Sequence, residues 1–255
     1  MIGNTAGISY GISSVVDGNM RLIDGSLTKL TQANRSRFFN KVGIGGYSFI
    51  SAGLMHSNKV EVVGGGECRS IIDNTDGLVT NHEGVFLTVT VADCLPIFFF
   101  DKVKKIVGIA HAGWKGILDG IVYNILSEMR GLGAADVFVF IGPHIGRCHF
   151  EVKEDVFSLF ERGYSRFFDA KYRIEDKSQL GDGSLKSEVL IDAGAGMFID
   201  LYMFVRKQLE FCGVPGRNIS RCEDCNYCKR DKYFSYRRDR PKEIEAMVAY
   251  IGIGG

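Results

Sequence analysis

Long apolar runs are missing from this chain of 255 residues. The most apolar segment, residues 85–100, is interrupted by Asp93 and Pro96 and is shorter than the roughly 20 residues that a membrane-spanning helix needs. The first 25 residues contain no basic stretch followed by an apolar stretch, which is the pattern of a secretory signal peptide. We therefore expect no membrane association and a cytoplasmic location.

An excess of charge of either sign is also missing. Lys and Arg together number 31, Asp and Glu together number 30, and the net charge is +1 at pH 7. Such a chain has no global field to attract nucleic acid or an anionic membrane, so any anionic ligand must be bound by a local group of cations. Hydrophobic residues at 45% and charged residues at 24% are the ordinary composition of a soluble globular protein.

Histidine and proline are scarce, with five and four residues, whereas seven cysteines are present. An odd number of cysteines in a chain without an export signal is not the pattern of a disulfide framework. We interpret these cysteines as reduced thiols or as metal ligands.

Apolar, β-branched runs alternate with amphipathic segments along the chain. Strands are expected at residues 8–16, 47–54, 59–63, 76–80, 85–91, 95–100, 106–110 and 137–141, and helices at residues 27–42, 114–129, 153–160 and 199–212. The polar segment 175–187 is expected to be a surface loop and not a domain linker. This interleaving favours an α/β fold, and we expect residues 1–255 to form a single domain.

Two of the expected strands lead into reactive side chains. Cys94 follows the run at residues 85–91, and His111 follows the run at residues 106–110. A thiol and an imidazole placed in this way can meet at one point. With a third ligand they would form a metal site, and without one they would form a nucleophile and its base. The plainer alternative is a core thiol and a histidine that caps the following helix.

Short blocks throughout the chain resemble the signatures of the laccase-domain (YfiH-like) family. They are Asn34-Arg35, Thr80-Asn81-x-x-Gly84-Val85, Ala92-Asp93-Cys94-Leu95-Pro96, Ala110-His111-Ala112-Gly113-Trp114-Lys115-Gly116, Ile141-Gly142-Pro143-x-Ile145-Gly146 with Glu151-Val152, and Phe234-Ser235-Tyr236-Arg237-Arg238. The blocks occur in order over residues 34–240. The resemblance implies a four-layer α/β/β/α sandwich of mixed sheets flanked by helices, like that of the cytotoxic necrotizing factor toxins.

The same resemblance implies a zinc site with two histidines and one cysteine as ligands. The matching residues are His56, Cys94 and His111, although the chain has Leu54 and Ser57 where the family has a glutamine and a glycine around the first histidine. Three protein ligands leave a fourth position open, which is the mark of a catalytic zinc. One thiolate and two neutral imidazoles would leave the site at +1, enough to lower the pKa of a bound water.

Further candidate residues accompany this trio. Asp93 should face away from Cys94 on a strand, but if the backbone bends there it could accept a hydrogen bond from a ligand imidazole; otherwise it is a turn carboxylate. The family blocks also supply four candidate anion-binding residues, which are Asn34, Arg35, Arg237 and Arg238. Because the last two are neighbours on an expected strand, only one of them should face the pocket.

Three more cysteines recur at intervals of three, at Cys222, Cys225 and Cys228. A bacterial iron–sulfur run needs a fourth cysteine at position 232, where this chain has a lysine, and Cys212 could complete a set only through the fold. We interpret the three as thiols, with a structural metal as the alternative. Three histidines, His82, His144 and His149, lie at positions that the family leaves variable, and we expect loop or surface side chains there.

The resemblance implies a zinc-containing purine nucleoside phosphorylase, which converts adenosine, inosine, guanosine or methylthioadenosine and phosphate into base and ribose 1-phosphate. The resemblance also implies adenosine deamination as an associated activity. Cys94, His111 and Asp93 are the expected catalytic residues, and Arg35 with Arg237 or Arg238 would hold the phosphate. We expect a purine nucleoside and phosphate as ligands, no nucleic acid partner, and a monomer.

Two other functions remain open and one is excluded. Without a metal, Cys94 and His111 would be a thiolate–imidazole pair for amide chemistry, as in family members that edit a peptidoglycan precursor. The second possibility is a non-catalytic binding module. A multicopper laccase needs about ten histidines for its copper centres, and this chain has five, so we exclude it.

Overall fold

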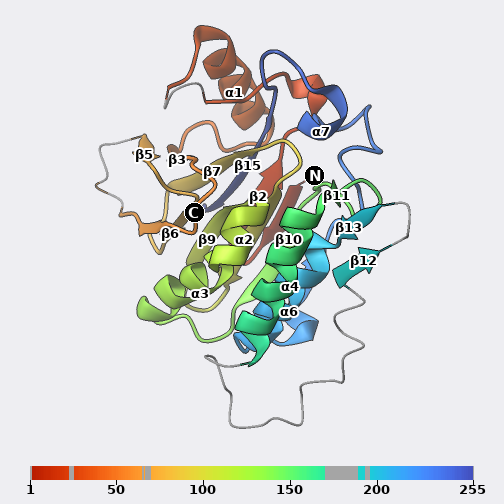
Figure 1. The fold of residues 1–255 in the computed structure, drawn as a ribbon. Helices are drawn as coiled ribbons and strands as arrows, with labels where there is room; N and C mark the ends of the chain where they lie inside the picture. The colour runs from red at the N-terminus through yellow and green to blue at the C-terminus, as the bar shows by residue number, and fades with distance from the viewer. Residues whose placement is uncertain are drawn as a thin grey trace.

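Two six-stranded mixed sheets lie face to face in the computed structural model, with helices on both outer sides (Figure 1). The structure describes residues 2–22, 26–64, 66, 70–169, 189–192 and 196–254. The four-layer α/β/β/α sandwich expected from the sequence is confirmed by this arrangement.

The first sheet contains the first and the last strands of the chain. In spatial order its strands are β1 (Ile2–Thr5), β2 (Ile8–Ile12), β15 (Met247–Ile253), β7 (Val85–Val91), β3 (Ser48–Gly53) and β5 (Ile71–Asp73). Strand β7 pairs antiparallel with β15 and parallel with β3, which makes the sheet mixed. Every residue of β7 is buried, because this strand is central in its sheet and both faces of the sheet are covered.

The second sheet contains the hairpin that carries the candidate residues. In spatial order its strands are β14 (Ile219–Arg221), β10 (Phe138–Ile141), β8 (Leu95–Asp101), β9 (Ile106–Ala112), β6 (Gly77–Thr80) and β4 (Val60–Val62). Strands β8 and β9 pair antiparallel, with Pro96 opposite His111 and Leu95 opposite Ala112. This register places the residue before β8, Cys94, next to the end of β9.

Helices and short segments complete the fold. The helices are α1 (Lys29–Lys41), α2 (Trp114–Asp119), α3 (Ile121–Gly131), α4 (Glu154–Asp169), α6 (Leu201–Phe211) and α7 (Tyr236–Asp239), with 3-10 turns η1 (Val15–Asp17) and η3 (Gly216–Asn218). A small sheet is formed by β11 (Glu151–Val152), β13 (Met197–Ile199) and β12 (Leu190–Asp192). Among the described residues, no helix has the length and apolar character needed to cross a membrane.

Alternation along the strands divides the apolar side chains among three buried clusters. On β7, Leu87 belongs to the cluster between the sheets, whereas Phe86 packs in the cluster with α1. On β8, Phe98 belongs to the cluster between the sheets, whereas Ile97 packs in the cluster with α3, α4 and α6. Both sheets therefore bury both faces, which explains why their central strands read as unbroken apolar runs.

The single helix expected over residues 114–129 is wrong, because two helices occupy this segment. Gly120 separates α2 from α3 with a left-handed φ of 89°, a conformation that glycine adopts at little cost. Ile117, Ile121 and Ile125 are nonetheless all buried. Both helices pack against β9, so the spacing of apolar residues continues across Gly120. The sequence pattern therefore does not show that the helix is interrupted there.

The strand expected around Arg237 and Arg238 is also wrong, because the short helix α7 lies there. Ser235 begins it, with its Oγ accepting a hydrogen bond from the Arg238 N–H at 3.2 Å. Successive helical residues also point in different directions, so the side chains of the two arginines still diverge.

The surface loop expected at residues 175–187 lies outside the described residues.

The Asp101 carboxylate ties the β8–β9 hairpin to the loop before β10. Its Oδ1 accepts hydrogen bonds from the backbone N–H groups of Val103 and Lys104, both at 2.9 Å. Its Oδ2 accepts from those of Ala135 at 2.9 Å and Asp136 at 3.0 Å. Burial opposes ionisation, but these four donors outweigh it and lower the pKa of Asp101.

We predict that Asp101→Asn lowers the free energy of unfolding by about 1.5–3 kcal/mol at neutral pH, because the amide cannot accept hydrogen bonds on both sides. Since folding lowers the pKa of Asp101, its contribution is complete above the unfolded value of about 3.9 and is lost as the pH falls through the lower folded value. Urea denaturation at pH 7 and near pH 3 should show a difference from wild type that shrinks in acid. An equal difference at both pH values would contradict this account.

Candidate metal centre and active site

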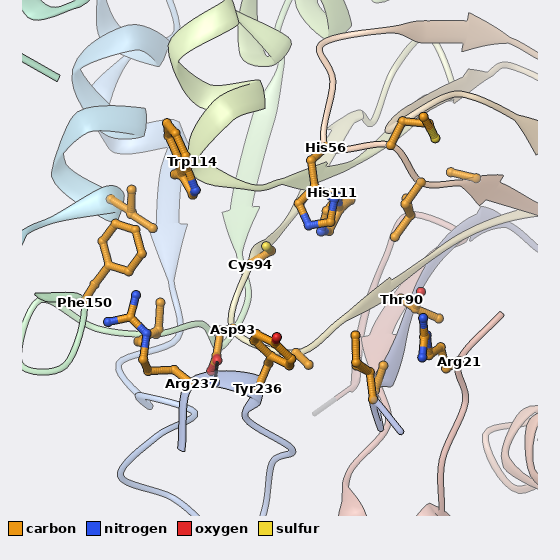
Figure 2. Close-up of a pocket in the computed structure, with 18 of the residues that line it drawn as sticks. Arg21, His56, Thr90, Asp93, Cys94, His111, Trp114, Phe150, Tyr236 and Arg237 are labelled. Carbon is orange, nitrogen blue, oxygen red and sulfur yellow. Dashed lines mark hydrogen bonds between the residues drawn. The ribbon is translucent and has the colours of Figure 1, made fainter. Parts of the chain in front are cut away.

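Three polar side chains that are far apart in the chain converge beside the end of the β8–β9 hairpin. One donor atom from each of His56, Cys94 and His111 lies within 4.8 Å of the others. The first residue follows β3, the second precedes β8 and the third lies in β9; Figure 2 shows their side chains close together. The two imidazole rings have centroids 4.8 Å apart and stand at 87° to each other. The fold therefore brings the suggested trio to one place.

Gly113 leaves open the space on which the three side chains converge. A Cβ atom at this position would lie 3.0 Å from His56 Cδ2, 3.4 Å from Cys94 Sγ and 3.7 Å from His111 Cε1. Imidazole nitrogen and thiolate sulfur are the donors that zinc prefers, and catalytic zinc sites use three protein ligands. The residues present here fit a zinc ion.

A buried carboxylate, that of Asp76, holds two of the three candidate ligands in place. Its oxygens accept hydrogen bonds from the N–H groups of Met55 at 3.1 Å, His56 at 3.0 Å and Ser57 at 2.8 Å, and from the Ser57 hydroxyl at 2.8 Å. The His111 Nδ1 lies 2.8 Å from the same carboxylate. Because an ionised carboxylate only accepts, His111 Nδ1 carries a proton, and Nε2 is the nitrogen that can bind a metal once it has lost its own proton.

The electrostatics of the trio favour a thiolate. Burial opposes ionisation of Cys94, but the charge of His111 and hydrogen bonds from His111 and His56 outweigh it and lower the pKa of the thiol to about 6. Burial likewise opposes a charged His111, but the thiolate and the Asp76 carboxylate raise its pKa. A thiolate is the form of cysteine that binds metals and attacks carbonyl carbons.

The trio lies in the wall of a cavity of about 1400 Å³. Its lining includes aromatic rings and cations, among them Trp114, Phe150, Tyr236, Arg21, Arg237 and Arg240. In Figure 2, Trp114, Phe150 and Arg237 lie on one side of Cys94, and Thr90 and Arg21 lie on the other. The cavity can thus offer a flat apolar surface and positive charge to the same ligand.

Asp93 lines the cavity but does not orient a ligand imidazole. Its backbone has a left-handed φ of 90°, so the bend considered from the sequence is present. The bend directs the carboxylate to α7, where Oδ2 accepts a hydrogen bond from the Arg237 N–H at 2.7 Å. Burial raises the pKa of this carboxyl group. The partner of His111 is Asp76, which the sequence did not single out; it adjoins β6, and β6 pairs with β9.

Of the two arginines in α7, only Arg237 lines the cavity. Its NH1 donates to the Glu151 carbonyl at 2.7 Å and to the His149 carbonyl at 3.4 Å, and its guanidinium lies 5.4 Å from the centre of the Phe150 ring. Arg238 turns away, donating to the carbonyls of residues 226, 227 and 233 and pairing with the neighbouring carboxylate of residue 239.

Asn34 and Arg35 do not line the cavity, in contrast to the expectation that they bind the anion. Asn34 Nδ2 donates to the Asn19 carbonyl at 2.9 Å, and Arg35 Nε donates to the Met20 carbonyl at 2.9 Å. Arg35 NH1 also donates to Ser51 Oγ at 3.1 Å. These bonds hold the segment that continues into Arg21, a cavity residue that no motif in the sequence marked.

The remaining histidines lie in three different surroundings. His82 is exposed, as expected for a loop. His144 lies in the loop after β10, as expected, but it is buried and not on the surface, and its Nδ1 donates to the Gly142 carbonyl at 2.8 Å. His149 is half-buried and stacks on Tyr227 with ring centroids 3.9 Å apart.

Comparisons with known proteins agree with this fold and with the sequence blocks. The family described as "Multi-copper polyphenol oxidoreductase laccase" matches residues 5–254. "Purine nucleoside phosphorylase YlmD" of Bacillus subtilis is 30% identical over 216 residues, which are 81% of this chain and 71% of that protein. "Purine nucleoside phosphorylase LACC1" of Mus musculus is 32% identical over 82% of this chain. This chain spans only 45% of the length of that mouse protein.

One further relative and two solved structures complete the comparison. "Adenosine deaminase RL5", from an unknown prokaryotic organism, is 30% identical over 68% of this chain and 60% of that protein. The structure of YlmD from Geobacillus stearothermophilus superposes with a TM-score of 0.81 at 27% identity, covering 98% of this chain and 93% of that one. The structure of YfiH from Bacillus licheniformis gives 0.78 at 25% identity, covering 96% and 92%. Matched over nearly its whole length, this chain belongs to the multi-copper polyphenol oxidoreductase laccase family, which confirms the YfiH-like resemblance of its sequence blocks.

Proposed function

We propose that this protein is a zinc-containing purine nucleoside phosphorylase of broad range, acting on adenosine, inosine, guanosine and methylthioadenosine. The observation that carries the proposal is the trio of His56, Cys94 and His111 in the wall of a cavity that also presents arginines and aromatic rings. Relatives at about 30% identity named as purine nucleoside phosphorylases support it. The proposal includes adenosine deamination as an associated activity, a cytoplasmic location and a monomeric state.

The size and lining of the cavity suit a nucleoside together with phosphate. Its volume of about 1400 Å³ exceeds the roughly 300–1,000 Å³ of most small-molecule pockets. Trp114, Phe150 and Tyr236 offer aromatic faces against which a purine base can stack. A base on an aromatic face would leave the ribose and the anion for the polar lining.

Arg237 is the proposed phosphate ligand. Its bonds to the Glu151 and His149 carbonyls fix the direction of the guanidinium at the cavity wall. In phosphorolysis a phosphate oxygen forms a bond to C1′ of the ribose while the bond from C1′ to the base breaks, and positive charge develops on the ribose. A held phosphate stabilises that charge and is aligned for attack. For Asn34 and Arg35 we propose a positioning role, through the segment that carries Arg21.

The trio is the proposed metal ligand set. His56, Cys94 and His111 would hold zinc, which when bound would supply Lewis acidity at this wall of the cavity. Asp76 keeps the His111 proton on Nδ1 and thereby aims Nε2 at the site. Asp93, held by the Arg237 N–H, is proposed to accept a hydrogen bond from the substrate. We propose zinc although the family description names copper, since five histidines are too few for a multicopper centre.

One observation favours a second function. Cys94, His111 and Asp76 also have the order of a nucleophile, its base and the residue that orients the base. In this alternative the protein is a metal-independent amidase, of the kind that edits a peptidoglycan precursor, and it is indifferent to phosphate. A binding module without turnover is the third possibility.

We predict that the zinc-loaded protein converts adenosine and phosphate into adenine and ribose 1-phosphate, with inosine as the product of deamination. Cys94→Ala should lower phosphorolysis by more than about 100-fold, since losing even an outer partner of a metal ligand typically costs 10–100-fold. Chromatography of the products with and without phosphate is the measurement. Cys222→Ala, which removes a thiol that does not line the cavity, should keep the activity. Amide cleavage by metal-free protein, or no product from any purine nucleoside, would contradict the proposal.

We also predict that Asp76→Asn weakens zinc binding by about 10–100-fold, because the amide cannot accept all the hydrogen bonds that fix residues 55–57 and His111. Competition with a chelating dye measures the affinity, and circular dichroism shows whether the variant is folded. Asp73→Asn is the matched control, because Asp73 is an exposed carboxylate of the same cavity. Unchanged affinity in a folded Asp76→Asn variant would refute the positioning role of this carboxylate.

A further inference from the structure

We propose that a second zinc ion, with a structural role, binds outside the cavity to Cys148, His149, Cys225 and Cys228. One donor atom from each of these residues lies within 4.8 Å of the others. None of the four lines the cavity that holds the first trio. Three thiols and one imidazole form a closed set of four ligands, which is the composition of a structural zinc site.

The distances among the donor atoms of Cys148, His149 and Cys228 are close to the edges of a tetrahedron around one zinc ion, and the donor atom of Cys225 lies within 4.8 Å of them. Zinc bonds of about 2.3 Å to sulfur and 2.0–2.1 Å to nitrogen give edges of about 3.8 Å between sulfurs and about 3.5 Å between sulfur and nitrogen. The Sγ atoms of Cys148 and Cys228 are 3.8 Å apart, and His149 Nδ1 lies 3.2 Å and 3.4 Å from them. A disulfide would bring two sulfurs to about 2.05 Å. The sulfurs of Cys148 and Cys228 are therefore spaced as two zinc ligands would be and not as a covalent pair.

The ligand set differs from the one that the cysteine run suggests. Cys225 and Cys228 have the two-residue separation common in zinc sites. Cys222, the third member of the run, stands outside the group; its sulfur accepts a hydrogen bond from the Asp224 N–H at 3.5 Å. The other two ligands, Cys148 and His149, come from a loop far earlier in the chain, which is why the run alone looked incomplete.

Backbone contacts hold the two loops together at this point. The Gly146 N–H donates to Cys225 Sγ at 3.2 Å, and bonds of this kind favour a thiolate. A Cβ on Gly146 would lie 3.3 Å from both Cys148 Sγ and Cys225 Cβ, which is tight, so a larger residue here would press on both cysteines. His144 pairs with Cys225 in an isolated bridge, and the Asn226 N–H donates to the His144 carbonyl at 3.0 Å.

An ion at this site would fix part of the cavity wall. The loop with Cys148 and His149 continues into Phe150, and the loop with Cys225 and Cys228 continues into α7, which carries Arg237. The Arg237 guanidinium donates to the His149 carbonyl, so a cavity residue already contacts a proposed ligand. Binding that favours the folded state over the unfolded state stabilises the protein and would stiffen this wall.

The test uses Cys94→Ala, in which the first trio has lost its thiol and no turnover is needed. After reconstitution with zinc in reductant and removal of excess metal, elemental analysis should find about one zinc per chain, and X-ray absorption should show three sulfurs at about 2.3 Å and one nitrogen. Introducing Cys148→Ser and Cys228→Ser together into the Cys94→Ala protein should remove the zinc and lower the Tm. Introducing Cys222→Ser alone into the same protein should leave the zinc content and the Tm unchanged.

Three outcomes would overturn the proposal. They are a metal-free Cys94→Ala protein, a bound zinc whose absorption spectrum shows fewer than three sulfurs, and a Cys148–Cys228 disulfide that forms while zinc is present. The absorption spectrum does not depend on whether the double serine variant folds. These experiments do not measure nucleoside turnover. A negative result would therefore refute the second zinc site without bearing on the proposed phosphorylase activity, and absence of that activity would not bear on the second zinc site.

Discussion

The candidate site depends on one buried negative charge, the carboxylate of Asp76. A charge without solvent is costly unless every oxygen is satisfied, and here three backbone N–H groups, a hydroxyl and an imidazole all donate to it. Through these bonds a single side chain sets the path of the loop that carries His56 and the tautomer of His111. The His56 backbone has a left-handed φ of 58°, a conformation that these bonds help to hold. The Asp76 carboxylate thus positions two of the three candidate ligands, His56 and His111.

The third ligand is placed by the sheets. Cys94 precedes a strand whose residues are all buried, and the pairing of Leu95 with Ala112 fixes its position relative to His111. Slipping this register by one residue would turn every side chain of β8 to the opposite layer, so the apolar clusters enforce the geometry of the site. Among the described residues, four of the six non-glycine positions with left-handed φ line the cavity, namely His56, Asn74, Asp93 and Arg240. The two packed sheets therefore support a cavity whose lining includes several residues with strained backbone conformations, as is common at functional sites.

The sequence predicted the central strands and the candidate metal ligands, but it did not predict the features that depend on contacts between residues distant in the chain. Uniform apolar runs identified β7, β8 and β9 because both faces of their sheets are covered. The motif blocks contain Cys94 and His111, and the family resemblance supplied His56, since spacing along the chain cannot show that His56 lies near Cys94. No local pattern distinguishes Asp76 from other carboxylates, because its role comes from the pairing of β6 with β9. The break at Gly120 and the turn of Arg35 away from the cavity were hidden for the same reason: each is decided by packing partners distant in sequence.

Of the two groups of potential metal ligands, the group of His56, Cys94 and His111 lines the cavity, and the group of Cys148, His149, Cys225 and Cys228 lies outside it. In this account the inner group serves the reaction and the outer group steadies the wall. The most direct test of the inner site is anomalous diffraction at the zinc edge from crystals of the zinc-loaded protein. The account predicts a peak bonded to His56, Cys94 and His111, with no fourth protein ligand. No peak at this place, or a peak closed off by another side chain, would contradict it.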